Sequence, residues 1–137
     1  MYLLDTNIIS ELRHGKPKQS PAVRAWAADK EMSRLFLSAI TVLELEKGVQ
    51  ALERKQPPQG GALRDWLDRV KFAFADRILP FNEDTAVLCA AMHFPQPKPE
   101  RDAMIAATAL QHRMALVTRN MADFENTGVA LIIPFET

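Results

Sequence analysis

Four acidic residues stand where an apolar segment of the chain meets the start of an expected helix. They are Asp5, Glu44, Asp102 and Asp123. A carboxylate beside buried apolar residues is costly to desolvate unless a positive charge compensates it. One divalent cation could compensate several of these carboxylates together, and it could support hydrolysis of a phosphate ester. The four acids are therefore candidate catalytic residues.

Each of these acids also has a simpler explanation as a helix cap. Thr41-x-x-Glu44 matches a capping box, and the same template fits at Asp123. Asp102 could complement a helix dipole, and Asp5 could cap the first helix. Capping alone would use Ser and Asn as readily as carboxylates, and Asp5 directly follows three apolar residues. The concentration of acids therefore favours a metal site.

The elements that would position these acids alternate between short apolar strands and amphipathic helices. Strands are expected at 2–4, 34–39, 77–81, 115–118 and 129–133. Helices are expected at 7–13, from Ser20 to 30, from Thr41 onward, at 62–74, at 82–93 and at 102–113. A short helical turn is expected near Asn120, and loops are expected at 55–61 and 95–99. No hairpin dipeptide joins two strands. The pattern predicts an α/β fold, a three-layer α/β/α sandwich around a parallel sheet of about five short strands.

A parallel sheet of this kind binds ligands beyond the carboxyl ends of its strands. Asp5, Glu44 and Asp123 follow the first, second and fourth expected strands, so they should share that edge. The position of Asp102 is not fixed by this reasoning. Thr6, Thr118 and Asn120 carry polar groups at the same edge and could orient water or phosphate, or serve as ordinary turn and cap residues.

The expected ligand atoms are all oxygen, since no thiolate or well-placed histidine accompanies the acids. This donor set predicts Mg²⁺, or Mn²⁺, rather than zinc or copper. Mg²⁺ usually keeps several waters and takes one or two carboxylates directly. We therefore expect Asp5 and Asp102 to bind it directly, and Glu44 and Asp123 to act through water.

The composition describes a chain with a core but without a strong overall charge. Its 137 residues are 47% hydrophobic, which predicts a single domain spanning 1–137. Seventeen basic and seventeen acidic residues cancel, so any nucleic-acid contact needs a local basic patch. Candidates for that patch are His14, Lys16, Lys18, Arg101 and Arg119.

The single cysteine, Cys89, cannot form an internal disulfide, and no long apolar segment opens the chain. These features predict a cytoplasmic protein without a membrane segment. Two expected helices carry Trp26, Trp66, Phe72 and Phe74, and Phe72 falls off the apolar stripe of its helix. A partly exposed aromatic residue there would suggest a protein partner.

Several sequence blocks together resemble a known family. DTNIISEL at 5–12, ITVLELEKG at 40–48, DAMIAATAL at 102–110 and TRNMADF at 118–124 are similar to the signature blocks of PIN-domain ribonucleases, in the same order. The nearest resemblance is to VapC-type toxins of bacterial type II toxin–antitoxin systems. One departure is the proline-rich segment FPQPKPER that precedes Asp102.

The resemblance implies a Mg²⁺-dependent endoribonuclease that cleaves RNA by metal-activated water. Asp5, Glu44, Asp102 and Asp123 match the acidic site of that family, and Thr118 and Asn120 match its polar neighbours. The implied partners are an antitoxin whose tail covers the acidic edge and a second copy of the chain.

Two other interpretations fit a small α/β protein with an acidic edge. A receiver-like phospho-acceptor domain should have an acidic pair after its first strand and a lysine after its last. Here Thr6 and Asn7 follow Asp5, and VALIIPFET has no lysine. The other alternative is a catalytically silent PIN-fold binding module. No glycine-rich phosphate loop follows any expected strand, which argues against nucleotide binding.

Overall fold

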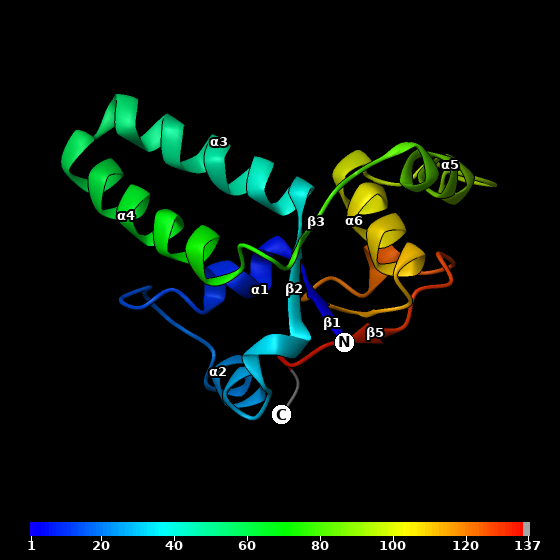
Figure 1. The fold of residues 1–137 in the computed structure, drawn as a ribbon, viewed down its shortest axis with the longest axis horizontal. Coiled ribbons are helices and arrows are strands. Elements are labelled where there is room, and N and C mark those ends of the chain that lie inside the picture. The colour runs from blue at the N-terminus through cyan, green and yellow to red at the C-terminus, as the bar shows by residue number, and fades with distance from the viewer. Residues whose placement is uncertain (136–137) are drawn as a thin grey trace.

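The centre of the fold is a five-stranded sheet in which every strand runs parallel to its neighbours. The computed structural model describes residues 1–135. The strand order is β3-β2-β1-β4-β5 (Figure 1). The strands are β1 (Tyr2–Leu4), β2 (Leu35–Ser38), β3 (Ile78–Leu79), β4 (Ala115–Val117) and β5 (Leu131–Ile132). The predicted α/β architecture with a parallel sheet is confirmed.

Alternate residues of the central strand β1 face opposite layers of helices. Leu3 pairs in register with Phe36 and Leu116 and belongs to one buried cluster. Leu4 belongs to the other buried cluster. Side chains alternate between the two faces of a strand, so a run of apolar residues in β1 fills both layers.

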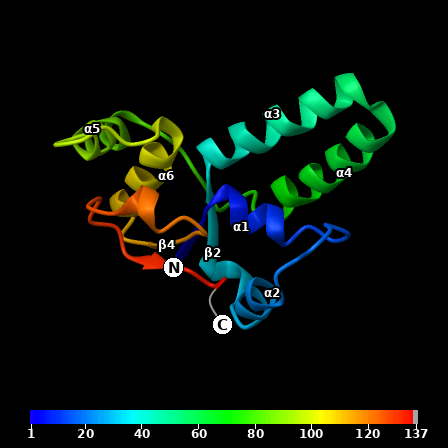
Figure 2. The ribbon, with the colours of Figure 1, turned by 180° about the vertical axis from the view of Figure 1, so that it is seen from behind.

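The helices divide between these two layers. Those on the Leu4 side are α1 (Thr6–Glu11), α2 (Pro21–Ala28), α3 (Ala39–Lys55) and α4 (Pro57–Ala73). On the Leu3 side lie α5 (Glu83–Met92) and α6 (Glu100–Gln111). The chain also forms two short 3₁₀ helices, η1 (Met32–Arg34) and η2 (Ala122–Phe124). Figure 2 shows α3 and α4 as a helical hairpin that projects away from α5 and α6.

The connection between α3 and α4 differs from the sequence prediction. Residues 55–61 were expected to form a loop, but α3 runs through Lys55 and α4 begins at Pro57. Proline suits the first helical position because its missing N–H would have no partner there. Gly60 is buried, and a Cβ at this position would lie 2.5 Å from the Glu53 Cα. Glycine therefore allows the two helices to approach closely.

Helices α3 and α6 each begin two residues earlier than the sequence predicts. Ser38 caps α3 by accepting the Thr41 N–H over 3.0 Å, so α3 starts at Ala39 and not at Thr41. Helix α6 starts at Glu100, which places Asp102 in its first turn instead of at its start. By contrast, the helices expected to begin at Ser20 and at residue 82 begin there, with the side chains of Ser20 and Asn82 as their caps.

Within residues 1–135, no helix combines the length and the apolar character needed to cross a membrane.

Candidate active site

Asp5 sits at the junction of β1 and α1, where it caps the helix. Its backbone N–H donates to the Val117 carbonyl over 2.9 Å, which fixes the residue to the end of β4. Its Oδ1 accepts the Thr6 N–H and its Oδ2 accepts the Thr118 hydroxyl, both over 2.7 Å. The side chain is 4% exposed. Burial raises the pKa of Asp5, the charges of Glu44 and Asp123 raise it further, and the two hydrogen bonds oppose the rise.

A short polar network holds Asp5 from the β4 side. The Thr118 hydroxyl, which donates to Asp5, also accepts the Asn120 N–H over 3.1 Å. Asn7, which was not among the predicted site residues, donates its side-chain amide to Asp5 Oδ2 over 3.3 Å and accepts the Arg119 N–H over 3.2 Å. Only its place two residues after Asp5 could have suggested this role.

Glu44 faces the site instead of closing a capping box on Thr41. Its Oε1 accepts the Thr6 hydroxyl over 2.5 Å, and Arg101 Nε lies 3.6 Å from its Oε2. The capping alternative for Glu44 is therefore wrong, because the Ser38 hydroxyl already caps the helix. Thr6, the first residue of α1, thus links Glu44 of α3 to the end of β1.

Asp102 shows most clearly that the acids act on one another. Its pKa is raised to about 6, first by burial and then by the charges of Asp5, Asp123 and Glu44, with a hydrogen bond to Asp123 adding to the rise. Like charges raise a carboxyl pKa strongly only when they are close. The charges of Asp5, Glu44 and Asp123 thus act on Asp102, and Thr6 joins Asp5 and Glu44 through two hydrogen bonds.

Asp123 belongs to η2, which is anchored by the buried ring of Phe124. The helix begins after Met121, and within the described part of the chain no side chain caps it. The interpretation of Asn120 and Asp123 as a capping box is therefore wrong. The carboxylate of Asp123 is not used as a helix cap, so its charge can act on the site.

A family model described as PIN domain matches residues 2–129. The chain belongs to the PIN-domain family. It is 35% identical to the VapC ribonuclease Y4jK of Sinorhizobium fredii, with 99% of each chain covered. It is 36% identical to the toxin FitB of Neisseria gonorrhoeae, over 98% of this chain and 99% of the relative. The resemblance to VapC-type toxins expected from the sequence is confirmed.

Solved structures agree with this assignment. A chain in the crystal structure of FitAcB from Neisseria gonorrhoeae superimposes with a TM-score of 0.90 at 35% identity, over 100% of both chains. A toxin–antitoxin complex from Klebsiella pneumoniae gives a TM-score of 0.72 at 25% identity, also over 100% of both chains. These matches favour the PIN-domain interpretation over the receiver-like alternative.

The donor set of this PIN-domain site suits a hard divalent cation. Its candidate ligands are carboxylate oxygens, and burial, followed by the charges of the neighbouring acids, raises the pKa of Asp102. In residues 1–135, no group of three Asp, Glu, His or Cys side chains is arranged to hold an ion directly. The assignment of Asp5 and Asp102 as direct ligands, with Glu44 and Asp123 acting through water, therefore stays a prediction.

Part of the predicted basic patch is already paired with acids. Lys16 Nζ lies 2.9 Å and Arg119 3.9 Å from the Glu11 carboxylate. Glu11 is 3% exposed and also accepts the Ser20 N–H over 2.7 Å. The hydrogen bond from Lys16 lowers the pKa of Glu11 despite its burial. Sequence reasoning missed this acid, because nothing in helical spacing showed that it would be buried.

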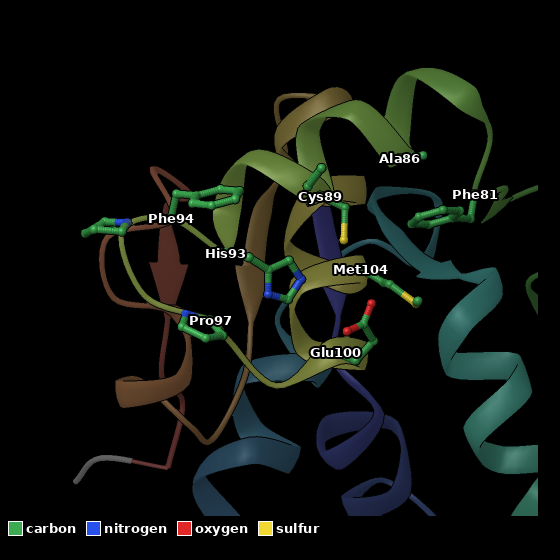
Figure 3. A pocket seen from close by; sticks show the side chains of 10 residues that line it. Phe81, Ala86, Cys89, His93, Phe94, Pro97, Glu100 and Met104 are labelled. Atoms are coloured by element: carbon green, nitrogen blue, oxygen red, sulfur yellow. The ribbon is translucent and has the colours of Figure 1, made fainter.

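A separate apolar cavity lies between α5, the 93–97 segment and the start of α6. It has a volume of about 710 Å³, and Figure 3 shows Phe81, Cys89 and Met104 among its walls. None of the four candidate acids lines it. Nearby, Val87 is 66% and Phe94 is 77% exposed. Phe72, on α4 in the other helix layer, is 87% exposed, as its place off the helix stripe suggested.

Proposed function

We propose that this PIN-domain chain is a Mg²⁺-dependent endoribonuclease and the toxin of a toxin–antitoxin pair. The observation that supports it most is that Thr6 joins two of the acids, because its N–H donates to Asp5 over 2.7 Å and its hydroxyl donates to Glu44 over 2.5 Å. Glu44 and Asp102 also line one cavity. Buried negative charge of this kind favours a cation and serves phosphate-ester chemistry. Relatives that match over nearly the whole chain are named as a VapC ribonuclease and a toxin.

In this proposal Asp5 and Asp102 would hold the cation directly, and Glu44 and Asp123 would hold its waters. A bound Mg²⁺ or Mn²⁺ would supply an activated water and stabilise charge on the phosphate. Attack in line on the phosphodiester would leave a 5′-phosphate and a 3′-hydroxyl.

The remaining polar residues position these carboxylates. Thr118 and the Thr6 N–H fix the two oxygens of Asp5, so one orientation of the carboxylate is kept. The Thr6 hydroxyl fixes Glu44 in the same way. Asn120, whose N–H is held by Thr118, would orient water or phosphate with its side chain.

The proposal includes two protein partners. An antitoxin tail would cover the acidic edge, since the matching structure from Klebsiella pneumoniae is a toxin–antitoxin complex. A second copy of the chain would cover the apolar face around Val87 and Phe94, since large exposed apolar side chains beside a cavity favour association. Light scattering should give the mass of a dimer for the wild type and of a monomer for Val87→Lys.

The test is cleavage of a single-stranded RNA by the purified chain with Mg²⁺ and with EDTA. We expect cleavage only with the metal, and its loss in Asp5→Asn, which removes one charge at constant volume. Asp84→Asn, an exposed acid on α5, is the matched control and should cleave normally. Unchanged cleavage by Asp5→Asn would exclude the metal role. No cleavage by the wild type with Mg²⁺ or Mn²⁺ would favour a silent binding module.

A further inference from the structure

A groove leads away from the acidic site between α1 and the α3–α4 hairpin. Its inner cavity, of about 270 Å³, is lined by Thr6 and Glu44 at one end and by Arg13. Its outer cavity, of about 460 Å³, is lined by Arg13 and Arg69. The two cavities share Arg13, Leu63 and Trp66, so they adjoin each other, and together they are named here the α1–α4 groove.

Basic side chains without acidic partners line this groove. In the described chain, Arg13, His14 and Arg69 take part in no ion pair. Arg64, on the same helix as Arg69, instead binds Glu46 over 2.8 Å. Cations that are not engaged by the fold remain available for phosphate groups.

An aromatic ring lies in the middle of the groove. Trp66 is half-buried, packs on the core beneath α4 and lines both cavities. Gln59, Leu63, Trp66 and Arg69 follow one face of α4, and at 1.5 Å per residue they span about 15 Å. A rigid indole between cations is a surface on which an unpaired base can stack.

We propose that the α1–α4 groove binds a single-stranded segment of the RNA substrate and leads it to the four carboxylates. Arg13 and Arg69 would contact phosphates, and Trp66 would stack on a base. The inference rests on the proposed ribonuclease function. A neutral protein with an acidic site needs positive charge near that site to hold a polyanion, and the arginines of the groove would supply it. A single strand is required, because bases in a duplex are already stacked.

The two tryptophans of the chain provide a matched pair of reporters. Trp26 lies on α2, outside both cavities, and packs edge-on against Tyr2 with ring centroids 5.3 Å apart. In an Asp5→Asn background that prevents cleavage, Trp26→Phe leaves Trp66 as the only tryptophan. Adding an unlabelled RNA oligonucleotide should quench its fluorescence. Trp66→Phe, which leaves Trp26, should show no quenching.

The arginines are tested by the anisotropy of a labelled single-stranded RNA in the same background. Arg13→Gln/Arg69→Gln should bind more weakly, and the slope of log K against log salt should fall by about 0.7 for each phosphate that an arginine no longer neutralises. Arg54→Gln is the control, since Arg54 is exposed on α3 and lines neither cavity. It should bind as the background does.

Unchanged affinity in the double arginine variant, or quenching of Trp26 alone, would overturn the proposal and leave the groove to another occupant, such as a protein tail. Failure of the groove proposal can be distinguished from failure of the proposed ribonuclease function. Metal-dependent cleavage without quenching of Trp66 contradicts only the groove. Quenching of Trp66 without cleavage by the unsubstituted chain contradicts only the nuclease.

Discussion

The hydroxyl of Thr118 donates a hydrogen bond to Asp5 Oδ2 over 2.7 Å, joining the ends of β4 and β1. Both residues are buried, at 0% and 4% exposure. Because the bond favours the charged carboxylate, it lowers the pKa of Asp5 against the effect of burial. The carboxylate of Asp5 is thus held by a neighbour that is 113 residues away in sequence.

Thr118→Val should therefore weaken both the site and the fold. The change keeps the shape of the side chain but leaves Asp5 Oδ2 without its shortest hydrogen bond. We expect the free energy of unfolding in urea to fall by about 1–2 kcal/mol and RNA cleavage to fall with it. Thr118→Ser, which keeps the hydroxyl, should retain most of both. Equal cleavage by the valine and serine variants would show that the bond does not position Asp5.

Asp102 should make the metal-free protein less stable as the pH rises. Its folded pKa of about 6 lies above the ordinary value of 3.8, so the folded state binds this proton more tightly than the unfolded chain. The contribution of Asp102 to stability is therefore largest below pH 4 and is lost as the pH rises through 6. At neutral pH Asp102→Asn should unfold with about 1–2 kcal/mol more free energy than the wild type.

The measurement is urea unfolding in EDTA at a series of pH values. The difference between wild type and Asp102→Asn isolates this group from other acids that titrate in the same range. Asp84→Asn, which also removes one acid, is the control for the substitution itself. A constant offset between wild type and Asp102→Asn across the series would contradict the shared electrostatic field.

Glu11 should have the opposite pH dependence. Its pKa is lowered by Lys16, so its contribution is present above the ordinary value of 4.5 and is lost as the pH falls through the folded value. Glu11→Gln should reduce the free energy of unfolding at neutral pH by about 1–2 kcal/mol, because Lys16 and the Ser20 N–H lose a charged acceptor. A difference that persists undiminished in acid would show that packing, not charge, is responsible.

Neighbouring glycines in α4 give a test of the helical hairpin. At Gly60 a Cβ would lie 2.5 Å from the Glu53 Cα, whereas at Gly61 it would meet nothing within 4 Å. Gly60→Ala should destabilise by about 1–3 kcal/mol through overpacking. Gly61→Ala should stabilise by about 0.5–1 kcal/mol, since alanine favours the helix. Thermal unfolding of the two variants is sufficient, and equal midpoints would contradict the close approach of α3 and α4.

Local chemistry explains which parts of this fold could be predicted from the sequence. Ser20 before Pro21 and Asn82 before an apolar run are strong helix starts, and both are present. The apolar run before Asp5 specified the central strand. The prediction of a loop at 55–61 was wrong because proline can also begin a helix and glycine can also allow two helices to approach closely. Only the packing of α4 on α3 reveals these two roles.

The sequence indicated the candidate acids but not the hydrogen bonds and ion pairs that surround them. The sequence indicated Asp5, Glu44 and Asp123 at one edge, but it could not place Asp102, whose helix begins two residues earlier than expected. The roles of Asn7 and Glu11 depend on partners far along the chain, such as Arg119. Contacts of this kind follow from the packing of strands and not from local spacing.

The central claim is that the four carboxylates share one divalent cation, and metal binding tests it most directly. Metal-free protein should be titrated with Mn²⁺ while the free ion is followed by electron paramagnetic resonance. The wild type and Asp84→Asn are predicted to bind the ion, and Asp5→Asn and Asp102→Asn to bind it much more weakly. Equal binding by all four proteins, or no binding by the wild type, would contradict the account.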